Sequence, residues 1–465
     1  MAIYDLVVIG SGPAGEKGAA QAAYFGKRVA LVEKEPDLGG AAANTGTLPS
    51  KTLRETALYL SGFRQRGLYG VELALKREAT VRDFLFRERL VKETERERIA
   101  RNLERHHVEV HRGRASFVDD RTVAVRSSEG GESRLTGSVF LIATGSSPHR
   151  SATIPFDDPR VYDSDTILQL SEIPPSMAVI GGGVIGCEYA CMFAALGIRV
   201  TLVEGRDILL PFLDGEFSLA LRERMVRMGI ALAMPGTVES VDAAGQNLTL
   251  KLGSGGEVSV RTMLVASGRS GNTAGLNLES LGIKLGKRGH IEVNERYQTA
   301  VPHIYAAGDV VGFPALAATS MEQARIAMVH AFDLKYKTSL APILPYGIYT
   351  IPEISMAGET EESLRQKKVD YVAGRATYAA NARGQIIGDG GGLLKLLFRR
   401  EDMRLLGVHV IGEQASELVH IGLTALLTGS GADLFIQTCY NYPTLSETYK
   451  YATYDALGRR GAPPS

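Results

Sequence analysis

The chain has 465 residues, of which 45% are hydrophobic and 22% are charged, a composition typical of globular proteins. Lys+Arg and Asp+Glu both number 52, so no net charge is available to attract nucleic acid or an anionic membrane surface. The length exceeds what one hydrophobic core usually serves, and we expect about two to four domains.

The first predicted unit is a strand, a glycine turn, a helix and a second strand. A β-branched run over residues 3–9 leads into Gly10-Ser11-Gly12-Pro13-Ala14-Gly15, and the second strand ends at Glu33, 18 residues after Gly15. Gly10 permits the tight turn, Gly12 lets the backbone approach a pyrophosphate, and Gly15 allows close helix packing. The helix N-terminus favours a phosphate, and Glu33 can accept hydrogen bonds from an adenosine ribose.

Residues 39–51 follow this unit and read GGAAANTGTLPSK. The segment resembles the active-site segment of FAD-dependent disulfide oxidoreductases such as dihydrolipoamide dehydrogenase. Members of that family carry two cysteines here, with four residues between them, facing the flavin. In this chain Ala42 and Thr47 occupy the two positions. The resemblance implies that the flavin scaffold is kept without its dithiol, so disulfide chemistry is not predicted.

Charge runs, cysteines and apolar runs indicate no further class of site. Arg and Glu alternate over residues 86–105, which is typical of a solvated helix face rather than a polyanion site. The three cysteines fit a reducing cytoplasm, and we interpret Cys187 and Cys191 as small buried hydrophobes rather than a metal or redox pair. No apolar run approaches the roughly 18 residues that span a bilayer. We predict a cytoplasmic protein with no metal, nucleic acid or membrane partner.

A second unit repeats the first pattern. The strand over residues 177–180 leads into Gly181-Gly182-Gly183-Val184-Ile185-Gly186, and the next strand ends at Glu204, 18 residues after Gly186. One such motif is weak evidence, but two in the same strand–turn–helix–strand context predict two dinucleotide sites. Two sites in one chain indicate one bound flavin and one exchangeable nicotinamide cofactor.

Further segments resemble the same family and imply which site is which. Residues 299–309 (TAVPHIYAAGD) resemble its second FAD motif, in which Asp309 would contact the ribityl chain. Residues 143–145 and 266–268 resemble the turns where the chain crosses between domains. The implied FAD contacts are Gly10, Gly12, Pro13, Ala14, Gly15, Glu33, Lys34, Gly40, Lys51, Thr144, Gly145 and Asp309. The implied NAD(P) contacts are Gly181, Gly183, Ile185, Gly186, Glu188, Glu204, Arg206 and Gly268.

The resemblance also implies the domain organisation. We expect an α/β fold with two Rossmann-like dinucleotide-binding domains, FAD-binding over residues 1–150 and 275–345 and NAD(P)-binding over 151–274. Residues 346–465 resemble the family's C-terminal dimerisation domain, an α+β domain that pairs two subunits head to tail. The predicted assembly is therefore a homodimer or a higher oligomer.

A lysine and a glutamate carry the predicted chemistry. In the family, a lysine at the position of Lys51 approaches flavin N5 and pairs with a glutamate at the eighth position of the nicotinamide fingerprint, here Glu188. Such a pair stabilises negative charge on the flavin and orients the nicotinamide ring. The alternative is an ordinary surface salt bridge. Because both residues occupy matching positions, we favour the functional pair, which needs no thiol.

The family's acid–base histidine, which comes from the partner subunit, is also replaced. Tyr442 stands in its place before Pro443-Thr444, whereas the glutamate that orients it is kept as Glu447. A phenol with a pKa near about 10 is a poor general base at neutral pH. With both thiols absent too, the chain is similar to the bacterial soluble pyridine nucleotide transhydrogenase branch of the family. That branch usually keeps the first cysteine, where this chain has Ala42. The other matching segments are residues 161–168, 183–189, 268–273 and 347–355.

This branch implies hydride transfer from NADPH to NAD+ through FAD N5 by a ping-pong mechanism. One site must then accept both cofactors: Glu204 favours a free ribose hydroxyl, and Arg206 is either a 2′-phosphate ligand or a solvated turn residue. The nearest alternative is an NAD(P)H:quinone or other acceptor oxidoreductase of the same fold. A flavin-bound structural or sensor protein is a third reading, but it would not need Glu188.

Overall fold

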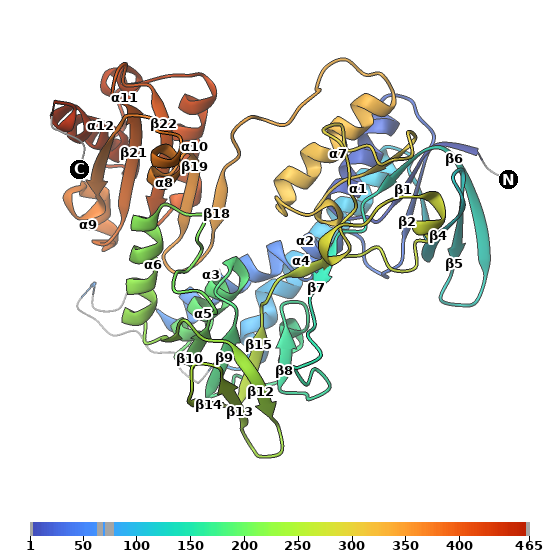
Figure 1. Ribbon diagram of the computed structural model, residues 1–465, viewed down its shortest axis with the longest axis horizontal. Helices are drawn as coiled ribbons and strands as arrows, with labels where there is room; N and C mark the ends of the chain where they lie inside the picture. Colours follow the sequence, from blue (N-terminus) through green and yellow to red (C-terminus); the bar gives the residue numbers. More distant parts are fainter. Residues whose placement is uncertain (1–2, 63–67, 70–78, 462–465) are drawn as a thin grey trace.

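The computed structural model describes residues 3–62, 68–69 and 79–461, which form three units with the two termini at opposite ends (Figure 1). The first unit is built on a sheet of order β3-β2-β1-β6-β5-β4, to which β17 adds beside β6. Strands β1, β2, β3, β6 and β17 pair in parallel, and β4 and β5 extend the sheet antiparallel. Its strands are β1 (Ile3–Ile9), β2 (Val29–Glu33), β3 (Glu109–Arg112), β4 (Arg114–Asp119), β5 (Thr122–Arg126), β6 (Glu132–Ile142) and β17 (Ile304–Ala306).

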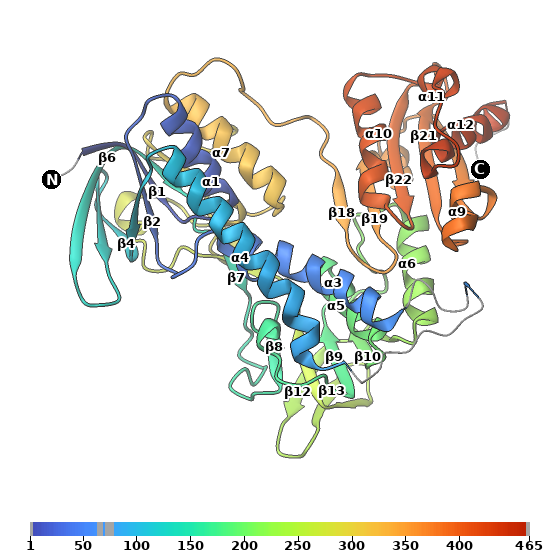
Figure 2. The same ribbon diagram turned by 180° about the vertical axis from the view of Figure 1, so that it is seen from behind.

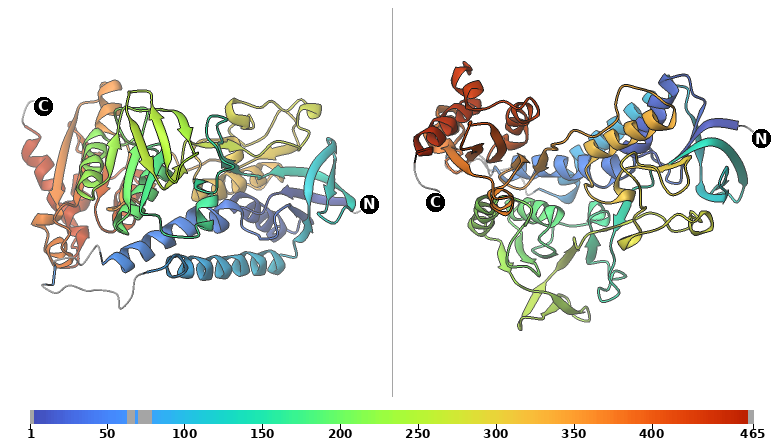
Figure 3. Two further views of the ribbon diagram at one scale, coloured as in Figure 1. Left: turned by 90° about the horizontal axis from the view of Figure 1, so that it is seen from below. Right: turned by 45° about the horizontal axis from the view of Figure 1, so that its top comes forward.

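Helices α1 (Pro13–Tyr24) and α7 (Ala317–Ala331) lie side by side on this sheet, although some 300 residues separate them (Figure 1). Glycine makes the close approach possible, because a Cβ on Gly18 would lie 2.5 Å from Leu141 and 3.5 Å from Ala324. Helix α4 (Val81–Arg105) runs from this unit toward the second one (Figure 2). It packs beside α3 (Thr47–Ser61) along one edge of the molecule (Figure 3).

The second unit has a parallel sheet of order β11-β10-β9-β15-β8, with a three-stranded antiparallel sheet, β12-β13-β14, beside it. Two short strands, β7 and β16, pair where the chain passes between the first two units. The elements are β7 (Ser146–Pro148), β8 (Val161–Asp163), β9 (Ser176–Ile180), α5 (Val184–Ala195), β10 (Arg199–Val203), α6 (Gly215–Arg227), β11 (Ala231–Ala233), β12 (Val238–Asp242), β13 (Leu248–Leu252), β14 (Glu257–Val260), β15 (Thr262–Val265) and β16 (Arg269–Gly271). The predicted fold class and both strand–turn–helix–strand units are confirmed.

The third unit is an antiparallel sheet of order β18-β19-β22-β21-β20, with α10 and α12 packed on it (Figure 2). Its strands are β18 (Tyr346–Ile348), β19 (Ile354–Gly358), β20 (Tyr371–Thr377), β21 (Leu393–Arg399) and β22 (Leu405–Ile411). Its helices are α8 (Glu361–Gln366), α9 (Ala382–Ile387), α10 (Ala415–Leu427), α11 (Ala432–Gln437) and α12 (Thr448–Arg459). The mixed α+β character matches the expectation for this segment.

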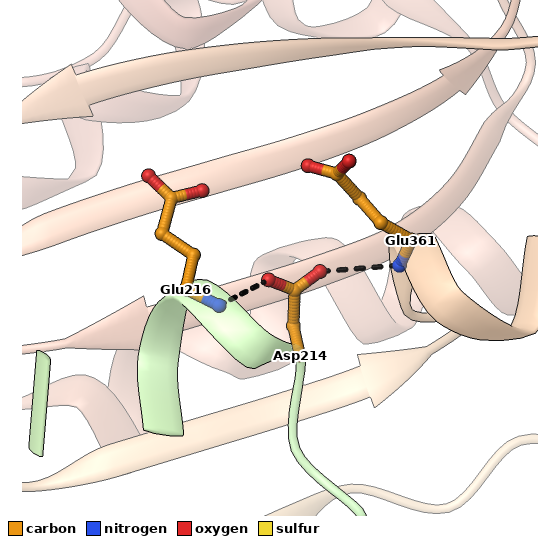
Figure 4. A group of neighbouring side chains, drawn as sticks. All are labelled: Asp214, Glu216 and Glu361. Atoms are coloured by element: carbon orange, nitrogen blue, oxygen red, sulfur yellow. Dashed lines mark hydrogen bonds between the residues drawn. The ribbon is translucent and has the colours of Figure 1, made fainter. Parts of the chain in front are cut away.

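A buried ionic cluster joins α6 of the second unit to the third. Asp214 caps α6 by accepting from the Glu216 N–H at 3.2 Å, and its other oxygen accepts from the Glu361 N–H at 3.1 Å (Figure 4). Oxygens of the three carboxylates lie within 4.8 Å of one another. The Lys395 ammonium stands among them, at 2.9, 2.8 and 2.5 Å from Asp214, Glu216 and Glu361. A lysine therefore balances the charge that a metal would otherwise balance.

Candidate functional site

Lys51 and Glu188 meet where the first two units come together. Helix α3 carries Lys51 and α5 carries Glu188, and the ammonium donates to Glu188 Oε2 at 2.8 Å. The second oxygen of Glu188 accepts from the Tyr349 backbone N–H at 2.9 Å, and the ammonium lies 4.9 Å from the Tyr349 ring centroid. The Glu188 side chain is only 5% exposed, whereas that of Lys51 is 28% exposed. The carboxylate is thus fixed on both sides, while the cation keeps an open face.

The two positions that hold the redox cysteines in the family carry no thiol in this chain. Ala42 lies on α2 (Gly40–Asn44) and Thr47 is the first residue of α3. Cys187 and Cys191 are buried on α5, and burial raises the pKa of both thiols, that of Cys191 to about 12. A raised pKa disfavours the thiolate, which is the nucleophilic form, so the burial of both side chains argues against a redox role. The interpretation of both as small buried hydrophobes fits this placement.

The first glycine turn has the shape that a phosphate requires. Gly10 has φ +102°, and a Cβ there would lie 2.4 Å from the Ala143 carbonyl oxygen. A Cβ on Gly15 would lie 1.8 Å from the Gly10 oxygen, so α1 packs against the turn only because this residue is glycine. Gly12 and Gly40 approach each other closely, because a Cβ on Gly40 would lie 2.8 Å from the Gly12 Cα. Pro13 starts α1 and Ala14 is buried behind it, leaving backbone N–H groups at the helix start.

Glu33 lies at the end of β2 and is 6% exposed. One of its carboxylate oxygens accepts from the Ser11 N–H at 2.9 Å and the Ser11 hydroxyl at 2.6 Å, and the other accepts from the Glu35 N–H at 2.9 Å. These bonds orient the carboxylate at the edge of the glycine turn. Lys34 points elsewhere, to a surface ion pair of 3.3 Å with Glu35.

A chain of polar contacts connects the second flavin motif to the turn at Thr144 and Gly145. Asp309 accepts from the Ser146 hydroxyl at 2.9 Å, and Ser146 is in turn held by Arg269, which donates to its hydroxyl at 2.9 Å. The Thr144 hydroxyl oxygen is buried without a hydrogen-bond partner in the described chain. A buried hydroxyl without a partner is costly unless a ligand completes it, so this turn fits a polar cofactor.

The second glycine turn repeats this geometry on the other sheet. A Cβ on Gly186 would lie 1.8 Å from the Gly181 oxygen, as in the first turn, whereas a Cβ on Gly183 would meet nothing within 4 Å. Gly183 therefore faces open space at the start of α5. Ile185, in the first turn of that helix, is partly exposed. Gly268 lies two residues beyond Ala266, whose N–H bonds to the Ile180 oxygen at 2.8 Å, so it belongs to the same carboxyl edge.

Arg206 and Glu204 form a pair at the end of β10. The guanidinium donates to both carboxylate oxygens, at 2.9 and 3.1 Å, and Glu204 also accepts from the Gly182 N–H at 2.6 Å. Burial opposes ionisation of Glu204, but the hydrogen bonds from Arg206 and Gly182 outweigh it and lower its pKa. The same hydrogen bond raises the pKa of Arg206. Without a bound cofactor, Arg206 is therefore docked on the Glu204 carboxylate, and its role toward a 2′-phosphate stays a prediction.

Tyr442 and Glu447 do not join Lys51 and Glu188 within one chain. Tyr442 precedes the short helix η6 (Leu445–Glu447), and Glu447 is the last residue of that helix. The following helix, α12, lies at the far end of the third unit (Figure 1). Tyr442 is 76% exposed. Any contact between these two residues and the site must come from a second subunit.

Two contacts of the site were not predicted from the sequence. Tyr349 lies within the segment 347–355 but was assigned no role, and its backbone N–H is what orients Glu188. Ser146 and Arg269 connect the two crossover turns to Asp309. The only sign of the Ser146 and Arg269 contacts in the sequence is that both polar residues come directly after the crossover turns.

The similarity to known proteins agrees with this geometry. The family model described as pyridine nucleotide-disulphide oxidoreductase matches residues 4–330, and the model of that family's dimerisation domain matches residues 344–453. The chain belongs to this family. It is a flavin-type oxidoreductase scaffold, and none of the described helices is both long and apolar enough to cross a bilayer.

Relatives within the family cover the whole chain. A soluble pyridine nucleotide transhydrogenase of Mycobacterium bovis is 45% identical over 460 residues, covering 99% of this chain and 98% of its own. One from Yersinia enterocolitica is 41% identical, with 98% of each chain covered. The solved structure of LpdA from Mycobacterium tuberculosis superimposes with a TM-score of 0.90 at 26% identity, covering 98% of this chain and 99% of LpdA.

Proposed function

We propose that this chain is a transhydrogenase that moves hydride from NADPH to NAD+ with FAD as the carrier. The observation that carries the proposal is the intact Lys51–Glu188 pair, at 2.8 Å, in a site whose two thiols and histidine are replaced. Hydride-transfer residues are kept and disulfide-transfer residues are not. The relatives named soluble pyridine nucleotide transhydrogenase support this reading.

The first unit would hold FAD. Its diphosphate would lie against the side-chain-free backbone of Gly12 and Gly40 at the start of α1, its ribose at Glu33, and its ribityl chain at Asp309 and the unpartnered Thr144 hydroxyl. Bound there, FAD supplies a carrier that accepts two electrons at N5 from one nicotinamide and gives them to another. The residue contacts of this site and the domain boundaries stay predictions.

Lys51 would place a positive charge near N5, because Glu188 fixes the ammonium while leaving one of its faces open. Tyr349 fixes Glu188 in turn through its backbone N–H. A preorganised cation near a group that gains negative charge lowers the barrier without a reorganisation cost. The pair would thus orient the nicotinamide ring and stabilise negative charge on the flavin, and it would supply no proton to the reaction.

Arg206 gives one site a means of accepting both cofactors. Its side chain is 49% exposed, so its pair with Glu204 is worth about 0–1 kcal/mol and is readily exchanged. With NAD+, Glu204 accepts from the ribose hydroxyls. With NADPH, the guanidinium turns from Glu204 to the 2′-phosphate. We expect Arg206→Ala to raise the KM for NADPH about tenfold and to affect NAD+ little.

The match to a dimerisation domain over residues 344–453 supports a homodimer, in which Tyr442 and Glu447 would reach the partner's site. In that place the exposed Tyr442 ring covers the flavin instead of moving a proton. A cytoplasmic setting stays a prediction from the sparse cysteines.

The test is an anaerobic assay of FAD-loaded protein with NADPH and thio-NAD+, following thio-NADH. We expect saturable transfer that Glu188→Gln and Lys51→Met each slow about 100-fold while FAD stays bound. Lys335→Met, which removes a lysine that is 81% exposed, is the matched control and should change nothing. Oxidation of NADPH with no thio-NADH formed would refute transhydrogenation.

One observation favours a second candidate, an NAD(P)H:quinone or other acceptor oxidoreductase. Three aromatic rings from the three units meet: Tyr346 lies 6.2 Å from Phe313 and 5.9 Å from Phe212, ring centroid to centroid. Phe313 is 81% exposed, and an exposed ring can stack a planar acceptor. If quinone reduction is the main activity, Phe313→Ala lowers quinone turnover and leaves NADPH oxidation by thio-NAD+ unchanged.

A further inference from the structure

A hairpin from the first unit reaches the nucleotide edge of the second. Leu285 and Ile291 bridge its two arms, and the short helix η3 (Lys287–Gly289) forms its tip. Arg288, at the tip, has φ +59°. That left-handed conformation is unfavourable for a residue with a long side chain and persists only where the surroundings enforce it. The hairpin therefore holds Arg288 in a fixed place.

The Arg288 side chain lies against the backbone of Gly268. The Arg288 Nη1 lies 2.1 Å from where a Cβ on Gly268 would be, so any other residue at 268 would expel the guanidinium. Gly268 follows β15, and Val265 at the end of β15 pairs with Ile180 at the end of β9. Arg288 thus lies at the carboxyl edge of the sheet, beside the turn that starts at Gly181.

Arg288 also differs from the other arginines at this edge. Arg206 is docked on Glu204, Arg269 on Asp165 and Ser146, and Arg150 on Asp163. Arg288 makes no hydrogen bond or ion pair with any residue in the described ranges. An exposed guanidinium without an anionic partner is available to an anionic ligand.

The position along the edge selects the anion. The sheet order places β9 between β10 and β15, so Glu204, Gly183 and Gly268 follow one another along the edge. A dinucleotide with its adenosine ribose at Glu204 puts its diphosphate at Gly183 and the start of α5, where space is open. Neighbouring strands are about 4.8 Å apart, which is within the reach of an arginine.

We propose that Arg288 binds the diphosphate of the nicotinamide cofactor, from the side opposite to α5. The inference rests on the proposed function only in that a nicotinamide dinucleotide occupies this edge. Because NAD+ and NADPH share the diphosphate, Arg288 supplies affinity common to both cofactors, whereas Arg206 discriminates between them.

The test is binding by calorimetry to FAD-loaded protein, so that no turnover is needed. The probes are NAD+, NADP+, ADP-ribose, which keeps the diphosphate, and 2′,5′-ADP, which lacks it. We expect Arg288→Ala to weaken NAD+, NADP+ and ADP-ribose each about tenfold, the effect of losing one charge-assisted hydrogen bond at an exposed site, and to leave 2′,5′-ADP unchanged. Lys287→Ala removes the same charge from the same hairpin tip and is the matched control. FAD content and melting temperature check the fold of each variant.

Three results would overturn the inference. ADP-ribose binding unchanged in Arg288→Ala, with wild-type protein binding NAD+ normally, would refute the role of Arg288 and leave the proposed function standing. If Lys287→Ala weakens ADP-ribose binding as much as Arg288→Ala does, the hairpin acts through its overall positive charge and not through a direct contact of Arg288 with the diphosphate. Wild-type protein that binds neither NAD+ nor NADP+ would refute both proposals.

Discussion

Lys395 makes a sharp stability test, because it carries the positive charge at the centre of the cluster between α6 and the third unit. Its side chain is 1% exposed, as is that of Asp214. Burial opposes its charge, but the carboxylates of Asp214, Glu216 and Glu361 outweigh burial and raise the Lys395 pKa. The substitution Lys395→Met keeps a flexible side chain as far as Cε and removes the ammonium, with its charge and its hydrogen-bond donors.

The expected loss in the free energy of unfolding follows from the carboxylates that Lys395→Met leaves without their cation. Asp214 would remain buried with its ion-pair partner gone, whereas Glu216 and Glu361 keep Arg375, at 2.8 and 3.2 Å. Breaking a buried pair from one side costs about 3–5 kcal/mol. Since Glu216 is 34% exposed and partly solvated, we expect the lower end, about 3 kcal/mol.

Urea unfolding followed by circular dichroism measures this loss. Arg365→Met is the matched control, because it removes another cation from Glu361, but one that is 56% exposed and worth about 0–1 kcal/mol. Adding Glu361→Gln to Lys395→Met should recover part of the stability, because it removes a negative charge that repels the unpaired Asp214 carboxylate. If Lys395→Met costs no more than Arg365→Met, the cluster does not fasten α6 to the third unit.

Three further outcomes are expected. Gly183→Ala should leave the urea midpoint unchanged, because its Cβ enters open space, but it should weaken NAD+ binding about tenfold, because that space is where the cofactor would lie. Gly186→Ala should instead lower the urea midpoint, because its Cβ would lie 1.8 Å from a carbonyl oxygen of the same turn. Burial lowers the pKa of His409, so the unfolded chain protonates first and stability falls as the pH drops below about 6.5; His409→Gln should flatten that fall between about pH 7 and pH 5. A maleimide should label native protein once, at the exposed Cys439, and the two buried cysteines of α5 only after unfolding; Cys439→Ser should abolish native labelling.

Local pattern was sufficient to predict the two nucleotide units. The glycines of both turns are required because an added Cβ would lie as close as 1.8 Å to a backbone oxygen, and helices α1 and α5 begin within these glycine motifs. Because these constraints act within about thirty residues, they are visible in the sequence. The pairing of Lys51 with Glu188, 137 residues apart, was predicted only through family resemblance.

Contacts set by the docking of separate units could not be predicted in this way. Lys395 sits in the apolar run of β21, where a lysine signals an edge or a solvated face, and its partners come from residues 214, 216 and 361. The docking of Arg206 on Glu204 was equally hidden, because residues two apart on a strand end can point either way. Arg288 gave no signal at all, since its meaning comes from Gly268 on another unit.

The arrangement of the site explains why loss of the thiols need not end catalysis. Ala42 and Thr47 lie on α2 and at the first position of α3, whereas Glu188 is fixed from α5 and from the Tyr349 backbone. Neither cysteine position contributes to the bonds that orient Lys51. The scaffold therefore separates disulfide chemistry from nicotinamide chemistry, and substitution at one leaves the geometry of the other intact. A site that keeps only its nicotinamide chemistry can still use one nicotinamide as hydride donor and another as hydride acceptor.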